Sequence, residues 1–292
     1  MYFDFVNRNI TISKVWCKFL EFLENRLHFS METTQISPLH VEIKGSGTPV
    51  LLIHGFPFTS RMWKPQLDGL SHAGQILAPD LPGFGASPAA EPPFGVDQLA
   101  QACMHTLDTQ GITGPAVIGG LSMGGYIALA IARLYPERLR GLMLLSTRAG
   151  ADSAEAKANR DKSIATAQEQ GPTPAGEGMF PKLLAPANYE AQPETAAELK
   201  TIMASATTAG VVMALSAMRD RPDSTPTLGQ ISVPTLIVHG EDDQVIPKSE
   251  AEAMAAAIPN SQLHIIANAG HVPNLEQAAE FNAALEGFIR SV

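Results

Sequence analysis

The sequence predicts an α/β fold in which a mostly parallel central sheet is flanked by helices. Short apolar runs, typical of strands buried on both faces, alternate along the chain with segments of helical apolar spacing. This alternation is typical of a parallel sheet with helices on both faces. The chain has 292 residues, of which 45% are hydrophobic and only 17% are charged, so it can bury a large core.

The first part of the chain, between residues 39 and 146, carries this alternation. The stretch LHVEIKG alternates until a glycine ends it, whereas PVLLIH is a continuous apolar run. The third expected helix should end before Pro136, because proline cannot continue a helix. The expected strands are 39–45, 49–54, 75–80, 115–120 and 141–146, and the expected helices are 60–72, 96–110 and 123–135.

The pattern changes at about residue 148. Residues 148–226 are rich in Ala, Glu, Gln, Thr and Pro and contain helical stretches but no clear strand, with a loop expected at 171–178. We therefore expect one core, formed by 38–147 and 227–292, that is interrupted by a helical insertion. The expected elements after the insertion are the strands 233–240 and 262–267 and the helices 248–257 and 274–290.

Residues 1–37 form a separate N-terminal extension that is expected to be helical. Apolar residues from Ile12 to Leu27 recur at helical spacing, but charged residues interrupt them too often for a signal peptide. We interpret this extension as an appendage without a catalytic role, placed upstream of an original start at Met31. The alternative is an amphipathic helix that covers a partner, an entrance or a membrane surface.

Composition and charge exclude several classes of protein. The net charge is −9 and there is no run of Lys or Arg, so nucleic acid is not an expected partner. Cys17 and Cys103 do not make a disulfide framework, and Cys103 lies in a helical pattern typical of core packing. No run of about 18 apolar residues predicts a membrane span. We expect a cytoplasmic protein, and a homo-oligomer is left open.

One serine lies where a nucleophile would be presented. The segment Gly120-Leu121-Ser122-Met123-Gly124 follows an expected strand and opens an expected helix, which makes this G-x-S-x-G pattern informative. A serine at such a sharp turn presents its hydroxyl above the carboxyl end of the sheet, where open α/β sheets bind ligands. The alternative is a serine that only caps the helix.

A serine hydroxyl needs a base, which is usually a histidine that is oriented by a carboxylate. Of the eight histidines, His271 lies in the loop between the last expected strand and the last expected helix, where it can reach the carboxyl edge of the sheet. His239 is expected in the core and His264 in mid-strand. The carboxylate is expected in VHGEDDQVIP, where Asp242 and Asp243 are both candidates.

Five motifs carry a resemblance to a known family. They are HGFP (54–57), DLPGFGASP (80–88), GGLSMGG (119–125), HGEDDQVIP (239–247) and NAGHVPNLE (268–276). In this order they resemble the α/β-hydrolase superfamily, in particular its subgroup with a helical cap, over roughly residues 38–292. The resemblance implies the α/β-hydrolase fold with residues 148–226 as an inserted helical cap. It implies no metal and no organic cofactor.

The resemblance also implies roles for single residues. In that family the acid is the fourth residue of a G-x-x-D turn, which counts from Gly240 to Asp243 and makes Asp242 a neighbour. The chain order Ser, Asp, His is also that of this fold. The N–H of Met123, which follows the serine, would provide one donor of the oxyanion hole, and by resemblance the N–H of Phe56 would provide the other.

Further residues near these motifs are expected to shape the site without taking part in the chemistry. His54 and Gly55 are interpreted as forming a turn, and Asp80 as bracing the LPGFG loop. Phe56 and Phe58 are expected to wall the entrance. Apolar residues of the insertion could line an acyl or alcohol pocket, although most are expected to pack the cap onto the core: Met179, Phe180, Leu183, Leu184, Met203, Val211, Val212, Met213, Leu215 and Met218.

The expected activity is that of a serine hydrolase, a carboxylesterase-like enzyme that cleaves the ester bonds of a small molecule through an acyl-enzyme. The alternatives are a lactonase similar to enol-lactone hydrolases, a C–C bond hydrolase, and a cofactor-free perhydrolase or haloperoxidase-like enzyme. A more remote alternative is a non-catalytic ligand receptor of the same fold. Haloalkane dehalogenases and epoxide hydrolases of this fold carry an aspartate where this chain has Ser122. The natural substrate depends on the pocket and is not predicted.

Overall fold

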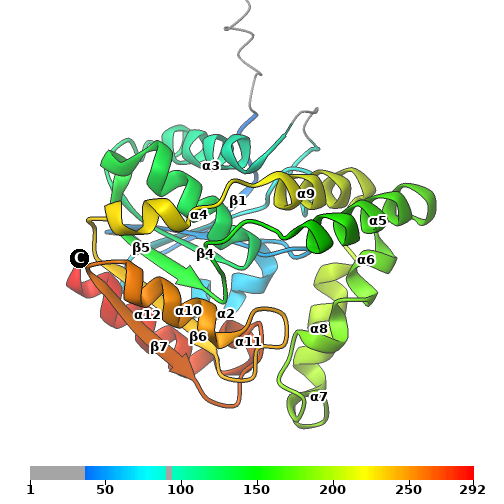
Figure 1. The fold of residues 1–292 in the computed structure, drawn as a ribbon. Coiled ribbons are helices and arrows are strands. Elements are labelled where there is room, and N and C mark those ends of the chain that lie inside the picture. Colours follow the sequence, from blue (N-terminus) through cyan, green and yellow to red (C-terminus); the bar gives the residue numbers. More distant parts are fainter. Residues whose placement is uncertain (1–36, 90–93) are drawn as a thin grey trace, which may run out of the picture. The chain divides into compact units, whose positions relative to one another are not determined.

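A seven-stranded sheet forms the centre of the part that our computed structural model describes, residues 37–89 and 94–292 (Figure 1). The strand order is β1-β3-β2-β4-β5-β6-β7. Only β1 runs antiparallel, against β3, so the predicted mostly parallel sheet is confirmed. The strands are β1 (Val41–Lys44), β2 (Pro49–Ile53), β3 (Gln75–Pro79), β4 (Ala116–Leu121), β5 (Leu139–Leu145), β6 (Thr235–Gly240) and β7 (Ser261–Ile266).

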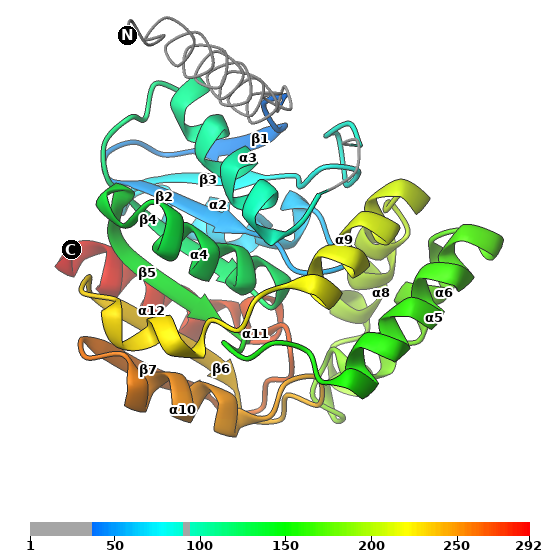
Figure 2. The ribbon, with the colours of Figure 1, turned by 45° about the horizontal axis from the view of Figure 1, so that its top comes forward.

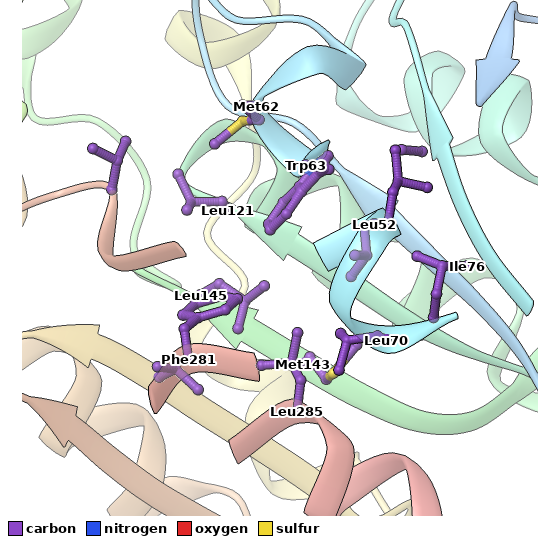
Figure 3. Packing of buried hydrophobic residues seen from close by; sticks show 14 of the residues in the cluster. Leu52, Met62, Trp63, Leu70, Ile76, Leu121, Met143, Leu145, Phe281 and Leu285 are labelled. Atoms are coloured by element: carbon purple, nitrogen blue, oxygen red, sulfur yellow. The ribbon is translucent and has the colours of Figure 1, made fainter. Parts of the chain in front are cut away.

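Helices cover both faces of this sheet. On one face, α2 (Lys64–Leu70) and α12 (Ala278–Ser291) pack against each other and against alternate strand residues. Figure 3 shows this core, in which Leu70 and Leu285 meet Met143. The views in Figures 1 and 2 place α3 (Val96–Thr109), α4 (Met123–Leu134) and α10 (Lys248–Ala257) on the opposite face. Cys103 on α3 is buried, as predicted, and burial raises the pKa of its thiol to about 12.

A run of helices separates β5 from β6 in the sequence, although these two strands are direct neighbours in the sheet. Within it, α5 and α9 pack along each other (Figure 2). The loop expected at 171–178 is wrong, because α6 forms there; its proline lies in the first helical turn, where a missing N–H costs nothing. These helices are α5 (Ala154–Gln170), α6 (Thr173–Glu177), α7 (Asn188–Ala191), α8 (Pro193–Met203) and α9 (Thr208–Asp220).

Two expected helices are divided in the structure. The expected helix 60–72 begins as a 3₁₀ turn, Ser60–Trp63, which Thr59 caps by accepting a hydrogen bond from the N–H of Arg61, and continues as α2. The expected helix 274–290 consists of α11 (Pro273–Glu276) and α12, with a non-helical backbone at Gln277 between them.

Two expectations concern segments beyond these elements. The N-terminal extension predicted at 1–37 lies outside the described residues apart from Ser37. Of the helices in the described ranges, none is by itself long and apolar enough to cross a membrane, and only the bent pair α8 and α9 passes that test when taken together.

Candidate active site

Ser122 lies on the sharp turn between β4 and α4. Its backbone has φ 55° and ψ −114°, a left-handed conformation that is strained for a residue with a side chain and is typical of functional turns. The glycines on either side are required by close approach. A Cβ on Gly120 would lie 2.0 Å from the carbonyl oxygen of Gly124, and a Cβ on Gly124 would lie 2.2 Å from that of Ile53. The G-x-S-x-G pattern therefore holds Ser122 against the ends of β2 and β4.

Two backbone N–H groups near Ser122 are available to a ligand. Met123 is the first residue of α4, so its N–H has no partner within the helix. Neither this N–H nor that of Phe56 donates a hydrogen bond to another described residue. The turn containing Phe56 lies against the serine, since a Cβ on Gly55 would be 3.3 Å from the Cβ of Ser122. Unpaired N–H donors, of which that of Met123 lies at a helix N-terminus, favour a developing negative charge.

Asp243 and His271 meet in a buried hydrogen bond. His271 Nδ1 lies 2.8 Å from Asp243 Oδ2, and both side chains are fully buried. The second carboxylate oxygen, Oδ1, accepts hydrogen bonds from the N–H groups of Val245 and Ile246. The neighbouring Asp242 is exposed and its side chain makes no hydrogen bond with a described residue. Of the two candidate acids, the structure therefore brings Asp243, not Asp242, to the histidine.

The charge of Asp243 fixes the tautomer of His271. Burial by itself would raise the pKa of Asp243, but the charge and hydrogen bond of His271 and the N–H of Ile246 hold it below its usual value. The carboxylate is therefore ionised at neutral pH and accepts the Nδ1 proton. The other nitrogen, Nε2, is then a proton acceptor in the neutral ring, and it is buried with no hydrogen-bond partner among the described residues.

Glu276 holds the loop that carries His271, a role that the sequence analysis did not identify. Its buried carboxylate accepts hydrogen bonds from the N–H of Gly270, the N–H of Ala185 and the Asn188 side chain, each 2.7 Å long. Burial raises the pKa of Glu276, and these hydrogen bonds offset part of that rise. The N–H of His271 itself donates to the carbonyl of a residue between β5 and β6, Leu183. Glu276 is the last residue of the NAGHVPNLE motif, and this position was the only indication of its role in the sequence.

His239 is buried, as predicted, and it also lies beside the candidate acid. Its Nε2 is 3.0 Å from the carbonyl of Ile246, to which it donates, and 3.4 Å from Asp243 Oδ2. Burial lowers the pKa of His239, so the ring is neutral at neutral pH. His239 therefore packs against the Asp243 carboxylate without neutralising it.

A cavity of about 540 Å³ opens at Ser122, a volume in the range of small-molecule sites. Phe56 lines it, but Phe58 does not; the expectation that Phe58 walls the entrance is wrong, because this side chain is fully buried in the hydrophobic core. The residues between β5 and β6 supply much of the remaining wall. Its apolar members include Met179, Leu215 and Met218, whereas Leu183, Leu184 and Val211 are buried in packing.

His54 and Asp80 have the structural roles that were predicted for them. His54 Nδ1 donates to the carbonyl of Gly55, and Nε2 accepts the N–H of Leu81. Burial lowers the pKa of His54 to about 4, so the ring is neutral. Burial opposes ionisation of Asp80 as well, but N–H donors such as that of Ala86 lower its pKa, and they anchor the LPGFG loop. No group of three potential metal ligands occurs in residues 37–89 and 94–292.

The buried His54 is expected to make stability depend on pH. Its pKa is about 4 in the folded state and 6.5 when exposed, so the unfolded state binds more protons between these values. Stability from this group is complete above pH 6.5 and is lost as pH falls, by an amount on the order of 3 kcal/mol over the window. In urea unfolding at pH 7.5 and 4.5, His54→Gln should therefore lose less stability than wild type. His105→Gln, an exposed site on α3, is the control, and equal losses in all three proteins would contradict the assignment.

Comparisons with known proteins identify relatives along most of the chain. Residues 50–284 match a family model described as "Alpha/beta hydrolase family". A thermophilic esterase from Thermogutta terrifontis, solved with malate bound, is 40% identical with a TM-score of 0.86, and the match covers 89% of this chain and 97% of that chain. An enol-lactonase from Burkholderia xenovorans LB400 is 25% identical with a TM-score of 0.79, and the match covers 86% and 96% of the two chains.

A curated relative matches at a similar level. The 3-oxoadipate enol-lactonase 2 of Acinetobacter baylyi is 28% identical over 229 residues, which are 78% of this chain and 84% of the relative. Of these three relatives, one is thus named an esterase and two are named enol-lactonases.

Proposed function

The chain belongs to the alpha/beta hydrolase family, and we propose that it is a serine hydrolase that cleaves carboxylic esters through an acyl-enzyme. The observation that carries this proposal is the hydrogen bond between Asp243 and His271. It leaves His271 Nε2 as an unpartnered acceptor among the described residues, while Ser122 lies at the cavity. The proposed nucleophile, base and acid would thus all come from the carboxyl edge of the sheet.

In the proposed reaction, Ser122 Oγ attacks the acyl carbon while His271 Nε2 takes the hydroxyl proton. Asp243 keeps the Nδ1 proton on the ring and stabilises the imidazolium that forms. The N–H groups of Phe56 and Met123 donate to the oxyanion, and each such donor typically contributes about 10²–10³ in rate. His271 then protonates the leaving alcohol. In the second half of the reaction, His271 takes a proton from water as the water attacks the acyl-enzyme, and it returns that proton to Ser122 Oγ as the acid leaves.

The helices between β5 and β6 act, in this proposal, as a cap over the nucleophile. Residues of α5 and α9, together with Met179, line the same cavity as Ser122. The N–H of His271 donates to the carbonyl of Leu183, and the Glu276 carboxylate accepts the N–H of Ala185; these two bonds tie this cap to the loop of the base. Closure of the site by these helices would exclude bulk water and strengthen the electrostatic interactions inside.

A lactone is the second class of substrate that we propose. Two of the three relatives are named as enol-lactonases, and a lactone is a cyclic ester that the same residues would open. The proposed partner is therefore a small-molecule ester or lactone.

The test combines turnover with labelling of the nucleophile. Wild type is expected to release p-nitrophenol from p-nitrophenyl acetate, butyrate or octanoate, with chain-length preference reporting the depth of the acyl pocket. A fluorophosphonate is expected to label one site, which mass spectrometry locates on Ser122. Labelling without turnover of any ester or lactone would overturn ester hydrolysis and favour C–C bond hydrolysis. Neither labelling nor turnover would overturn the proposed nucleophile and favour a ligand receptor.

A further inference from the structure

The cavity at Ser122 has a cationic wall. Arg148, Arg160 and Lys182 line it, and no Asp or Glu is among the described residues that do. The chain as a whole has 29 acidic and 20 basic residues, so this clustering of cations runs against its composition. We refer to Arg148, Arg160 and Lys182 as the cationic wall. Neutral substrates give no reason for such a wall.

One buried carboxylate positions the two arginines. Asp152, whose side chain is fully buried, accepts from Arg148 Nη2 at 2.7 Å and from Arg160 Nε. It also accepts from Arg221 Nη1 at 2.7 Å. Three guanidinium groups thus share one carboxylate, a surplus of two positive charges within this cluster, and the charge of Glu250 also acts on Arg148. Arg221 does not line the cavity; its Nη groups also donate to the carbonyls of Met218 and Gly150, and its buried Nε has no partner among the described residues.

The two wall arginines keep donors for a further anion. The side chain of Arg148 is 26% exposed and that of Arg160 is 21% exposed, so water hydrates each only in part. Arg148 Nη1 and the Nη groups of Arg160 donate to none of the described residues; Arg148 Nε also has no partner among them, but it is buried. A planar guanidinium with unused N–H groups matches a carboxylate, which can accept two parallel hydrogen bonds.

The wall lies next to the nucleophile by the topology of the sheet. β4 and β5 are parallel neighbours, and their last residues, Leu121 and Leu145, are paired. Ser122 directly follows β4. Thr147, which precedes Arg148, donates from Oγ1 to the carbonyl of Ser122 at 2.8 Å. Arg148 therefore directly follows Thr147, whose side chain is bonded to the backbone of Ser122.

We propose that the cationic wall binds a free carboxylate of the substrate, so that the preferred substrates are esters or lactones that carry a second, unesterified carboxyl group. This inference rests on the proposed function and adds the chemical class of the substrate. Monoesters of short dicarboxylic acids are the simplest members of this class. The carboxylate would be held by Arg148 and Arg160 while the ester carbonyl reaches Ser122.

The test compares three ethyl esters of equal length by acid release. Monoethyl glutarate carries the carboxylate, ethyl 4-carbamoylbutanoate replaces it by a neutral amide, and ethyl pentanoate replaces it by a methyl group. Wild type is expected to prefer monoethyl glutarate in kcat/KM. Arg148→Met and Arg160→Met should each lower this value by about 10–100-fold, mainly through KM, and change that for ethyl pentanoate by less than about threefold.

Control measurements separate the subsite from general damage. Arg219→Met removes an arginine of α9 that pairs with the exposed Asp161 and does not line the cavity, so the preference should remain. Arg148→Lys should keep more of the preference than Arg148→Met, because lysine retains the positive charge but lacks the paired N–H donors of the guanidinium. Equal losses on all three esters, or a wild type without preference for the anion, would overturn the subsite and leave the esterase proposal intact.

Binding of glutarate itself, measured by calorimetry, distinguishes the failure of the two proposals. Wild type and Ser122→Ala are expected to bind glutarate alike, and Arg148→Met about 10-fold or more weakly. Arginine-dependent binding in a protein that turns over no ester would refute the proposed function and retain the subsite. Absence of binding to wild type, with active hydrolysis of neutral esters, would refute the subsite alone.

Discussion

Ser122→Ala is expected to lower kcat for the best ester substrate by roughly 10⁶-fold. Under the proposed mechanism the oxygen that forms the acyl bond is removed, and a loss of this size follows removal of the nucleophile in a serine protease with a Ser-His-Asp triad. The N–H groups and the pocket remain, so the variant should still exceed the uncatalysed rate in water by about 10³–10⁴-fold. Stability should change little, because alanine and serine are comparably strained at φ 55°. The measurement is kcat on p-nitrophenyl butyrate, with circular dichroism to verify folding.

Ser146 offers a matched control for this variant. It follows β5 as Ser122 follows β4, it is buried, and its backbone also has positive φ, 41°. Its hydroxyl has no partner among the described residues, and it does not line the cavity. Ser146→Ala should therefore keep kcat within about threefold. If Ser122→Ala kept more than a hundredth of the wild-type rate, Ser122 would not be the nucleophile.

The strands were predictable because their burial leaves a direct trace in the sequence. β2 and β4 lie inside the sheet with helices on both faces, and continuous apolar runs with adjacent glycines mark them. The break between α11 and α12 was not predictable, because apolar residues keep helical spacing on both sides of Gln277. What stops the first helix is tertiary: Glu276 turns its carboxylate towards Gly270 and the residues before α7.

The candidate site was predictable only where one short motif contains the geometry. The strained turn at Ser122 and the loop of His271 are local, and their motifs identified both. Spacing alone left Asp242 and Asp243 open, since the distinction depends on which side chain turns towards a loop 28 residues away. The cationic wall left no signal, because the apolar residues of α5 give no clear face. Only the fold places Arg160 of that helix beside Asp152 and over the cavity.

Asp243→Asn is expected to lower kcat by about 10⁴-fold, because it should force His271 into the wrong tautomer. In wild type, Oδ1 accepts from the N–H groups of Val245 and Ile246, and Oδ2 accepts from His271 Nδ1. An asparagine must keep its single oxygen towards the two N–H donors, so its NH₂ group faces the histidine. Nδ1 then has to accept, Nε2 carries the proton, and the ring cannot take the proton of Ser122.

The neighbouring aspartate makes this prediction sharp. Asp242→Asn changes the same functional group one residue earlier, on an exposed side chain without a described hydrogen bond, so its kcat should stay within about threefold of wild type. Both variants are measured at pH 7.5 on p-nitrophenyl butyrate, with unfolding in urea to verify that the buried site tolerates the amide. A large loss in Asp242→Asn with near-normal activity in Asp243→Asn would transfer the role of the acid to Asp242. Comparable activity in both would mean that His271 needs no carboxylate, and the proposed mechanism would then lose its basis in the Asp243–His271 hydrogen bond.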